Sequence, residues 1–261
     1  MENLSRKYDI DSFWDNLSEA AHSVLMLDYD GTLAPFVSDR DQAVPYPGVR
    51  QRLTALLGSS RTRLVIISGR AVKDLTPLLD IHPLPEIWGS HGLERLDEQG
   101  RYQSASQGER PSEGLAAVYW WARDNNLLAQ TERKPLGIAF HWRGLEKSER
   151  TRIHKAVESR WQSELAQFDL QLHEFDGGLE IRCMGITKAD AVQSIMSQTP
   201  VDAVMAYLGD DRTDEDAFKA LADRGLSVLV REKSGDTAAD IRLEPPAEML
   251  QFLDRWQRLT V

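Results

Sequence analysis

Two aspartates that stand two positions apart, Asp28 and Asp30, follow directly on an apolar run. Residues 24–27 have the length and composition of a buried strand, and in an extended chain residues i and i+2 point the same way. One carboxylate can therefore act as a nucleophile or metal ligand while the other transfers protons. Gly31 and Thr32 come next and supply a turn and a hydroxyl group. Taken alone, this pattern is better explained by an ordinary strand that ends in an Asp-Gly turn.

Two further apolar runs, residues 64–67 and 204–208, also end on residues that can do chemistry. The polar residues and glycines that follow the runs are Ser68, Gly69 and Arg70 in the first case and Gly209, Asp210, Asp211 and Asp214 in the second. Lys188 stands between the two runs, in the first turn of a predicted helix. Ligands of an open parallel sheet gather at the carboxyl ends of its strands. The repetition of the pattern therefore favours a catalytic site over a set of ordinary turns.

The four polar groups, in their order along the chain, resemble the motifs of the haloacid-dehalogenase-like phosphotransferases. Among these, the chain is most similar to the trehalose-6-phosphate phosphatases: Asp28 begins DYDGTLAP, Gly89 begins GSHGLE and Gly209 begins GDDRTDE. The resemblance spans nearly the whole chain. It implies an α/β fold, with a Rossmann-like parallel-sheet core of the haloacid-dehalogenase type and an inserted α+β cap domain. The implied activity is hydrolysis of trehalose 6-phosphate, a step of trehalose biosynthesis.

The pattern of the chain changes at about residue 110 and changes back at about residue 183. The segment between has predicted helices at 111–129 and 146–166 and predicted strands at 130–134, 136–143, 170–175 and 179–183. We interpret residues 110–183 as the cap, and residues 1–109 and 184–261 as the catalytic core.

The core has its own predicted elements. The helices are expected at 11–21, 47–57, 70–79 and 246–258, and later strands at 87–88, 226–230 and 240–243. Two further helices are expected to be capped, by Thr187 with Asp190 and by Thr213 with Asp216.

The resemblance assigns four catalytic residues, Asp28, Asp30, Ser68 and Lys188. Asp28 is expected to attack phosphorus and form an aspartyl phosphate, and Asp30 to protonate the departing sugar oxygen and then deprotonate water. Asp30 has to hold a proton for the first step, so its pKa must be raised. We expect crowding among five carboxylates to raise it. Ser68 and Lys188 are expected to bind phosphoryl oxygens, together with free amides at the start of the helix that follows Arg70.

Clustered carboxylates predict a site for Mg²⁺, a hard cation that prefers oxygen ligands. The expected metal-binding residues are Asp28, Asp30 through its carbonyl, and Asp210, with Asp211 and Asp214 acting through water.

One face of the predicted cap sheet is polar. Ile138 and Phe140 alternate with His141 and Arg143, and Glu180 likewise opposes its apolar neighbours. Such a face simply meets water in an ordinary sheet, whereas in a lid it binds sugar hydroxyls, and the resemblance favours the lid. The expected substrate-binding residues are Asp28, Tyr29, Asp30, Gly31, Thr32, Ser68, Gly69, Arg70, Glu132, Lys134, Arg143, Glu180 and Lys188.

Composition limits the partners. The 261 residues carry a formal net charge of −10, which argues against nucleic acid, and the one cysteine excludes an internal disulfide bond. No apolar run has the length of a membrane span or a signal peptide. We expect a cytoplasmic monomer that binds a small sugar phosphate and neither nucleic acid nor membrane.

Two alternatives stay open. Another sugar-phosphate phosphatase or a phosphomutase of the same superfamily shares these motifs, because the cap reads the far end of the substrate. A non-catalytic sugar-phosphate sensor would be expected to lose a catalytic carboxylate, whereas Asp28, Asp30, Asp210 and Asp214 are all present.

Overall fold

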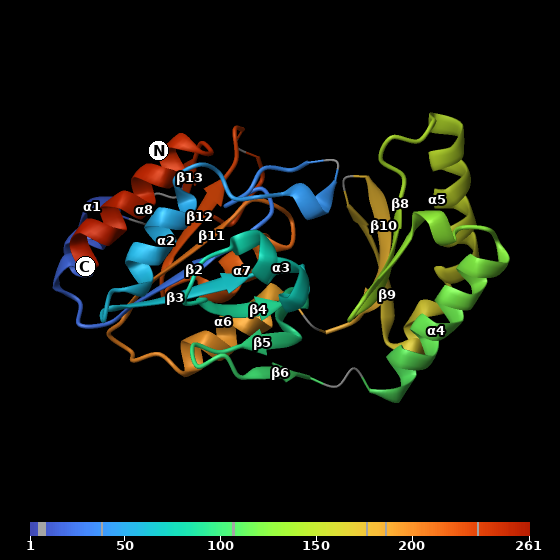
Figure 1. The fold of residues 1–261 in the computed structure, drawn as a ribbon, viewed down its shortest axis with the longest axis horizontal. Helices are drawn as coiled ribbons and strands as arrows, with labels where there is room; N and C mark the ends of the chain where they lie inside the picture. The colour runs from blue at the N-terminus through green and yellow to red at the C-terminus, as the bar shows by residue number, and fades with distance from the viewer. Residues whose placement is uncertain (5–8, 38, 106–107, 176, 186, 234) are drawn as a thin grey trace. The chain divides into compact units, whose positions relative to one another are not determined.

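The computed structural model describes residues 1–4, 9–37, 39–105, 108–175, 177–185, 187–233 and 235–261. Two compact units divide the chain: Met1–Ser104 together with Thr187–Val261, and Ala105–Ile186 (Figure 1). The second unit is thus an insertion into the first. The expected cap, residues 110–183, lies within this insertion.

The first unit is built on a nine-stranded sheet with the strand order β1-β13-β12-β11-β2-β3-β4-β5-β6. The strands are β1 (Glu2–Asn3), β2 (Ser23–Leu27), β3 (Thr62–Ile67), β4 (Glu86–Gly89), β5 (Glu94–Leu96), β6 (Tyr102–Ser104), β11 (Val204–Gly209), β12 (Leu226–Val230) and β13 (Ile241–Leu243). The run from β13 to β4 is parallel, and β1, β5 and β6 pair antiparallel at the edges. The carboxyl ends of β11, β2 and β3 therefore lie next to one another.

Helices cover both faces of this sheet, which is why the central strands are continuous apolar runs. The helices are α1 (Ile10–Glu19), α2 (Val49–Leu57), α3 (Val72–Leu79), α6 (Lys188–Ser197), α7 (Asp214–Leu221) and α8 (Ala247–Thr260). Leu25 and Leu27 pack with α1, α2, α3 and α8, whereas Val24 and Met26 pack with α6 and α7. The alternation along β2 thus fills two separate cores.

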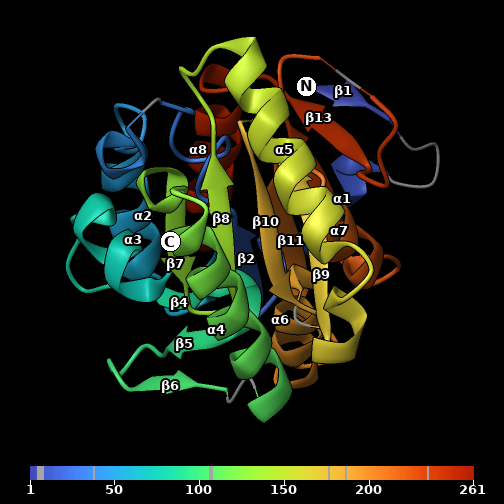
Figure 2. The ribbon, with the colours of Figure 1, turned by 90° about the vertical axis from the view of Figure 1, so that its right-hand side faces the viewer.

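The second unit is a four-stranded antiparallel sheet with two helices on one face (Figure 2). Its strands, in the order β7-β8-β10-β9, are β7 (Thr131–Lys134), β8 (Gly137–His141), β10 (Gly178–Cys183) and β9 (Leu170–Phe175). Its helices are α4 (Glu109–Asp124) and α5 (Lys147–Trp161). Trp121 of α4 contacts Phe140 of β8 and Trp161 of α5, so the apolar face of the sheet lies under the helices.

The expected helices and strands are all present, with shorter ends in places. The helix predicted to reach residue 129 ends at Asp124, because Asn126 adopts φ +57° and no longer fits a right-handed helix. The strand predicted for 136–143 ends at His141. The sequence did not predict the short edge strands β1, β5 and β6.

Candidate active site

The carboxyl ends of three adjacent strands bring the predicted catalytic side chains together. Asp210, Asp28 and Ser68 follow directly on β11, β2 and β3, which are neighbours in the parallel sheet. The Asp28 amide donates to the Leu208 carbonyl at 2.8 Å, so pairing of the strands continues up to this residue. The three polar side chains are buried.

The ammonium group of Lys188 joins two of the aspartates. Its Nζ donates to Asp28 Oδ1 and to Asp214 Oδ1, each at 2.7 Å. Lys188 opens α6, and the start of this helix is fixed because the amide and hydroxyl of Thr187 donate to the Asp190 carboxylate at 2.7 and 2.9 Å. The predicted capping box is thereby confirmed, and it places the lysine beside Asp28.

The carboxylate of Asp214 is fully hydrogen-bonded. Oδ1 accepts from Lys188 and from the Tyr207 hydroxyl, and Oδ2 accepts the amides of Asp210 and Asp211 at 3.0 Å each. A carboxylate offers about four acceptor positions, and here all are used. Asp214 therefore holds Lys188 and the turn that carries Asp210.

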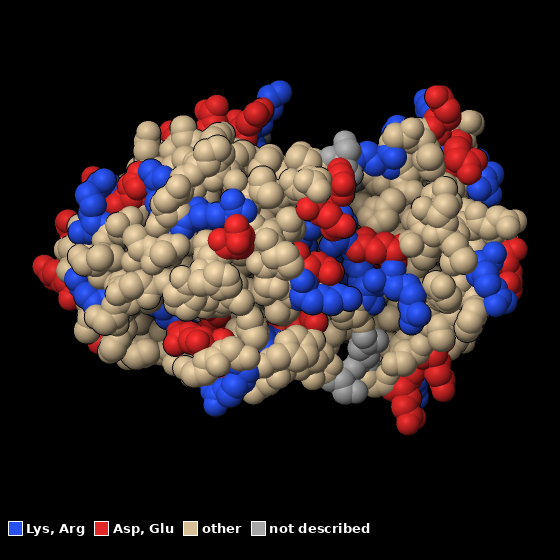
Figure 3. All heavy atoms as spheres, viewed as in Figure 1, with Lys and Arg blue, Asp and Glu red and all other residues tan. Residues whose placement is uncertain are grey.

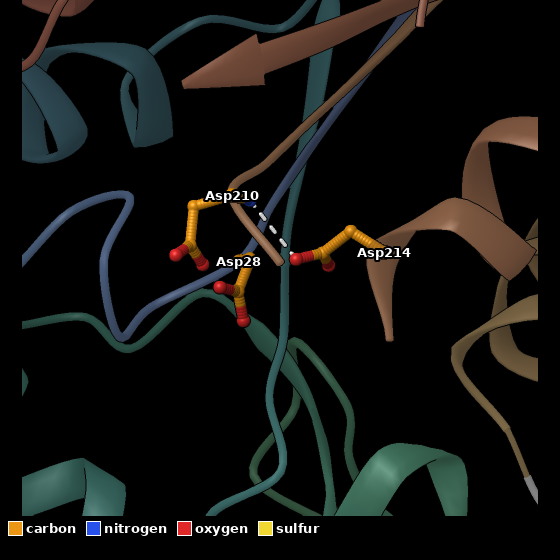
Figure 4. Close-up of side chains that lie close together, drawn as sticks. All are labelled: Asp28, Asp210 and Asp214. Atoms are coloured by element: carbon orange, nitrogen blue, oxygen red, sulfur yellow. Dashed lines mark hydrogen bonds between the residues drawn. The ribbon is translucent and has the colours of Figure 1, made fainter. Parts of the chain in front are cut away.

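The remaining carboxylates fit a divalent cation. One oxygen from each of Asp28, Asp210 and Asp214 lies within 4.8 Å of the others (Figure 4). Asp210 Oδ1 is buried and has no hydrogen-bond partner in the structure as described. Because Asp214 is fully bonded, Asp28 and Asp210 are the members with an oxygen to offer. A buried oxygen without a donor suits a hard cation such as Mg²⁺.

A glycine brings the first motif against Asp210. Gly31 has φ +84°, and a Cβ at this position would lie 2.2 Å from Asp210 Oδ2. Its amide donates to the Ala34 carbonyl at 2.7 Å and closes the turn. Thr32 is buried, and its hydroxyl has no partner among the described residues. Any side chain at residue 31 would displace Asp210, so the loop with Asp30 requires glycine here.

Negative charge exceeds positive charge in this cluster. Burial, together with Asp28 and Asp214, raises the pKa of Asp210 to about 10. Burial also raises the pKa of Asp28 well above its ordinary value, although Lys188 opposes this. Burial alone lowers the pKa of Lys188, but Asp214 and Asp28 outweigh it and raise the pKa well above its ordinary value. The lysine is therefore charged, and the cluster has room for further positive charge.

Asp211 is held by the turn that follows β11. Its Oδ1 accepts the amide and the hydroxyl of Thr213 at 2.7 Å each. Burial acts to raise the pKa of Asp211, but Lys188 and the two bonds from Thr213 outweigh it and lower the pKa to about 2. The predicted cap of α7 by Thr213 with Asp216 is wrong, because the Thr213 hydroxyl bonds Asp211, which forms a turn with the backbone two residues on.

Asp30 faces a cation. Arg70 Nε donates to Asp30 Oδ2 at 2.7 Å, and Nη2 donates to Oδ1 at 2.6 Å. Burial acts to lower the pKa of Arg70, but Asp30 outweighs it and raises the pKa. The predicted crowding of Asp30 among carboxylates is not what the structure shows, since a guanidinium takes both of its oxygens. Arg70 Nη1 is buried and unbonded within the described chain, so it can reach a further acceptor.

Ser68 and the start of α3 differ in what they can bind. The Ser68 hydroxyl oxygen accepts the Arg70 amide at 3.1 Å, which leaves its own proton to donate. The helix begins at Val72, and the Val72 amide donates to Glu94 Oε2 at 3.1 Å. The prediction that free amides at the start of this helix meet the substrate anion is therefore wrong at Val72, because a carboxylate of the protein occupies the position.

Two of the remaining predicted binding residues of the first unit have structural contacts. Gly69 lies under the His91 imidazole, where a Cβ would approach Cε1 and Nε2 to 2.8 Å. The Tyr29 side chain is buried in the core, and its hydroxyl donates to the Ala43 carbonyl at 2.7 Å. Tyr29 alternates with Asp28 along the chain, so its side chain points away from the carboxylates.

The second unit has a polar face of its own. Lys134 Nζ lies 3.2 Å from Glu180 Oε1, and Glu132 Oε2 lies 2.7 Å from His141 Nε2. Glu132 and Glu180 both pair with Ala139 of the strand between them, so they lie in one row across the sheet. Four of the predicted sugar-binding side chains or their partners thus meet on one face.

Arg143 lies beyond the end of β8 rather than on the strand. A Cβ at Gly177 would approach Arg143 Nε to 3.0 Å, so the two residues are in contact where the chain turns from β9 to β10. Gly177 has φ +94°, which suits glycine at a hairpin turn.

A family model described as trehalose-phosphatase matches residues 26–247, most of the chain. The chain belongs to the trehalose-phosphatase family. It is 29% identical over 268 residues to the probable trehalose-phosphate phosphatase H of Arabidopsis thaliana, a match that covers 94% of this chain and 75% of that relative. The prediction of a phosphatase of this family is confirmed.

Solved structures confirm the fold class of this trehalose-phosphatase family member. The C-terminal domain of the Candida albicans trehalose-6-phosphate phosphatase has a TM-score of 0.79 at 21% identity, and the match covers 100% of this chain and 99% of that one. A haloacid-dehalogenase-like hydrolase from Bacteroides thetaiotaomicron has a TM-score of 0.63 at 16% identity, covering 90% and 99%. The predicted haloacid-dehalogenase-like α/β fold is thereby confirmed.

Two polar residues of the family member's site were missed from the sequence. Tyr207 lies in an apolar strand, and a buried phenol needs a hydrogen-bond partner. A tyrosine within such a run was therefore the sequence signal for a polar contact here. Glu94 follows β4 within the GSHGLE segment, and a carboxylate at a strand exit was the signal there.

In the part of this family member that the structure describes, each helix is too short or too polar to span a bilayer.

Proposed function

We propose that this enzyme hydrolyses trehalose 6-phosphate to trehalose and phosphate through an aspartyl phosphate on Asp28, with Mg²⁺ as its cofactor. The observation that supports this best is the contact between Lys188 and Asp28 at a buried strand end, in a member of the trehalose-phosphatase family. The lysine fixes one oxygen of the carboxylate and stabilises its charge. The other oxygen is the nucleophile.

In the first step Asp28 Oδ2 forms a bond to phosphorus while the bond from phosphorus to the sugar oxygen breaks. Asp30 gives its proton to that oxygen, so that trehalose leaves as a neutral alcohol. Lys188 and Ser68 donate hydrogen bonds to phosphoryl oxygens, which stabilises the negative charge of the transferred group.

In the second step water attacks the phosphorus of the aspartyl phosphate, and Asp28 is released as a carboxylate. Asp30 accepts the proton of this water and keeps it for the next sugar. Arg70 holds Asp30 in place for both transfers, because two parallel hydrogen bonds fix the orientation of a carboxylate.

Asp28 and Asp210, together with the carbonyl of Asp30, are the proposed Mg²⁺ ligands. The buried Oδ1 of Asp210, which has no hydrogen-bond partner among the described residues, supports this assignment. Asp211 and Asp214, whose carboxylates are bound by the turn, orient the ligands from behind. When bound, the ion would neutralise charge on the phosphoryl group.

The polar face of the second unit is proposed to bind the sugar. Glu132, Lys134, Arg143 and Glu180 supply the carboxylates and cations that pair with hydroxyl groups. The ion pair between Lys134 and Glu180 supports a built site, because Glu180 is 5% exposed and its orientation is fixed.

A phosphate-release assay tests the proposal. Trehalose 6-phosphate, glucose 6-phosphate and p-nitrophenyl phosphate are compared with Mg²⁺ and with excess chelator. We expect the highest kcat/KM on trehalose 6-phosphate and no turnover in chelator. A better rate on glucose 6-phosphate moves the assignment to another sugar-phosphate phosphatase, and full activity in chelator contradicts the metal assignment.

A further inference from the structure

We propose that Glu94 is a positioning residue for the hydrolysis, whose carboxylate anchors the loop of Ser68, Gly69 and Arg70 from behind. This inference rests on the proposed function, since it assigns the effect of Glu94 to residues that act in that reaction. Glu94 itself is not placed against the substrate.

Three donors converge on Glu94, which is 5% exposed. Oε2 accepts the Val72 amide at 3.1 Å and the Ser90 hydroxyl at 2.7 Å, and Oε1 accepts the Tyr102 hydroxyl at 2.6 Å. Val72 is the first residue of α3, where a carboxylate is also favoured by the helix dipole. Glu94 thus fixes the start of the helix that follows the loop.

The neighbours of Glu94 hold the loop through its backbone. The Ser90 amide donates to the Arg70 carbonyl at 2.8 Å, and the His91 amide donates to the Ser68 carbonyl at 2.9 Å. Ser90 and His91 have φ +49° and +58°, which is unfavourable for residues with side chains. Such backbone has to be held by its surroundings, and the bond between the Ser90 hydroxyl and Glu94 does this.

Arg70 extends the chain of contacts to Asp30. Its carbonyl is bound by Ser90 and its guanidinium holds both oxygens of Asp30. Removing the anchor at Glu94 is therefore expected to shift Arg70 and Ser68 without removing any group that touches the substrate. A misplacement of about 1 Å in an active site lowers rates about 100-fold.

A second buried glutamate provides a matched control. Glu86 is the first residue of β4, whereas Glu94 on β5 pairs with the last, Gly89. Glu86 is 1% exposed and accepts hydrogen bonds from Arg63, Trp88 and Arg95. It is as buried as Glu94, but these three partners, among the described residues, lie outside the loop of Ser68, Gly69 and Arg70. Loss of the Glu86 carboxylate is expected to lower stability and leave kcat unchanged.

The experiment compares Glu94→Gln and Tyr102→Phe with Glu86→Gln and the exposed Glu98→Gln. A glutamine at residue 94 has a single side-chain oxygen that accepts hydrogen bonds, whereas the carboxylate has two. Glu94→Gln therefore loses the bonds made by either Oε1 or Oε2. We expect kcat on trehalose 6-phosphate to fall about 10- to 100-fold in Glu94→Gln. In Tyr102→Phe, which loses one hydrogen bond to the Glu94 carboxylate at a half-exposed side chain, we expect about a 2- to 10-fold fall. KM is expected to stay within about threefold, because the sugar-binding face is untouched.

A double-mutant cycle tests whether Glu94 affects kcat through the loop that carries Arg70. If Glu94 acts through the loop, Glu94→Gln costs much less kcat in an Arg70→Ala background than in the wild type. Equal costs in both backgrounds, or an equal loss of kcat in Glu86→Gln, would overturn the proposal. If Glu94→Gln does not fold, Tyr102→Phe in the same two backgrounds decides. The wild-type rate tests the proposed function separately, and the cycle can be measured on p-nitrophenyl phosphate if another sugar phosphate proves to be the substrate.

Discussion

Arg70 holds both carboxylate oxygens of Asp30, with Nε 2.7 Å from Oδ2 and Nη2 2.6 Å from Oδ1. The guanidinium is 5% exposed and the Asp30 side chain 29%, so the pair closes one side of the site while Asp30 keeps access to water. This contact fixes the direction in which Asp30 can transfer a proton. A bidentate pair needs the planar fork of arginine.

Arg70→Lys is therefore expected to lower kcat on trehalose 6-phosphate by about 10-fold or more, because an ammonium group cannot hold both oxygens and Asp30 loses its orientation. The loss is expected to be smaller on p-nitrophenyl phosphate, whose leaving group needs little protonation. Steady-state rates on both substrates measure the difference. An Arg70→Lys enzyme with the wild-type rate on trehalose 6-phosphate would show that the pair does not orient Asp30.

Asp28→Asn is expected to abolish phosphate release, on the order of 10³-fold or more, while the fold is kept. The amide has the shape of the carboxylate but cannot form the acyl phosphate. Phosphate release is measured at saturating Mg²⁺, and circular dichroism checks the fold. Acid quenching of the wild type with labelled substrate is expected to trap a phosphoprotein that hydroxylamine cleaves, and the variant is expected to trap none. Substantial turnover by the folded variant would contradict the covalent route.

The parallel centre of the fold was predictable because its strands are apolar runs between helices. β2, β3 and β11 each show the run and the polar exit. The edge strands gave no such signal. β6 is three residues long and exposed throughout, so it has neither the apolar run nor the alternation that indicates a strand.

The proximity of Asp28, Ser68, Lys188 and Asp210 was predictable from the order of the motifs on strand ends. The partners of each group were not. The bond between Arg70 and Asp30 depends on how a long side chain reaches across 40 residues of sequence, and the sequence predicted crowding instead. Glu94 at the start of α3 depends likewise on the antiparallel return of β5 beside β4, a strand that the sequence did not predict.

Glu180→Ala is expected to lower kcat/KM on trehalose 6-phosphate by an amount on the order of 2–4 kcal/mol in transition-state free energy. The carboxylate is buried against Lys134 at 3.2 Å, so its loss removes an acceptor and leaves a cation without this partner. p-Nitrophenyl phosphate lacks the sugar and is expected to lose little.

Glu174→Ala is the control for this variant. Glu174 pairs with Leu179 on the opposite face of the same sheet, and its side chain is 67% exposed. It is expected to change neither rate. Equal losses of Glu180→Ala on both substrates would mean that Glu180 supports the fold rather than recognition of the sugar.

Asp210→Asn is expected to stabilise the metal-free protein at pH 8 and to remove its response to Mg²⁺. In the fold, burial and the neighbouring Asp28 and Asp214 raise the pKa of Asp210 from 3.8 to about 10. Below pH 4 the carboxyl group is protonated in both states and pH has no effect through it. Between about pH 4 and pH 10 the unfolded chain releases this proton while the native state keeps it, so native stability falls as pH rises.

An asparagine has no such proton, so this pH-dependent cost disappears. In chelator at pH 8 the melting temperature of the variant is expected to exceed that of the wild type by at least about 2–4 °C, the equivalent of ~1 kcal/mol for a chain of this size. The difference is expected to vanish near pH 4. Added Mg²⁺ is expected to reverse the order, because the wild type gains stability from binding an ion that neutralises the cluster and the variant does not.

Asp211→Asn serves as the opposite control: the pKa of Asp211 is lowered to about 2, so its carboxylate stabilises the native state and its loss is expected to lower the melting temperature. A wild-type protein whose stability in chelator rises from pH 5 to pH 8 relative to Asp210→Asn would show that Asp210 is ionised without a metal, and that the cluster tolerates its charge.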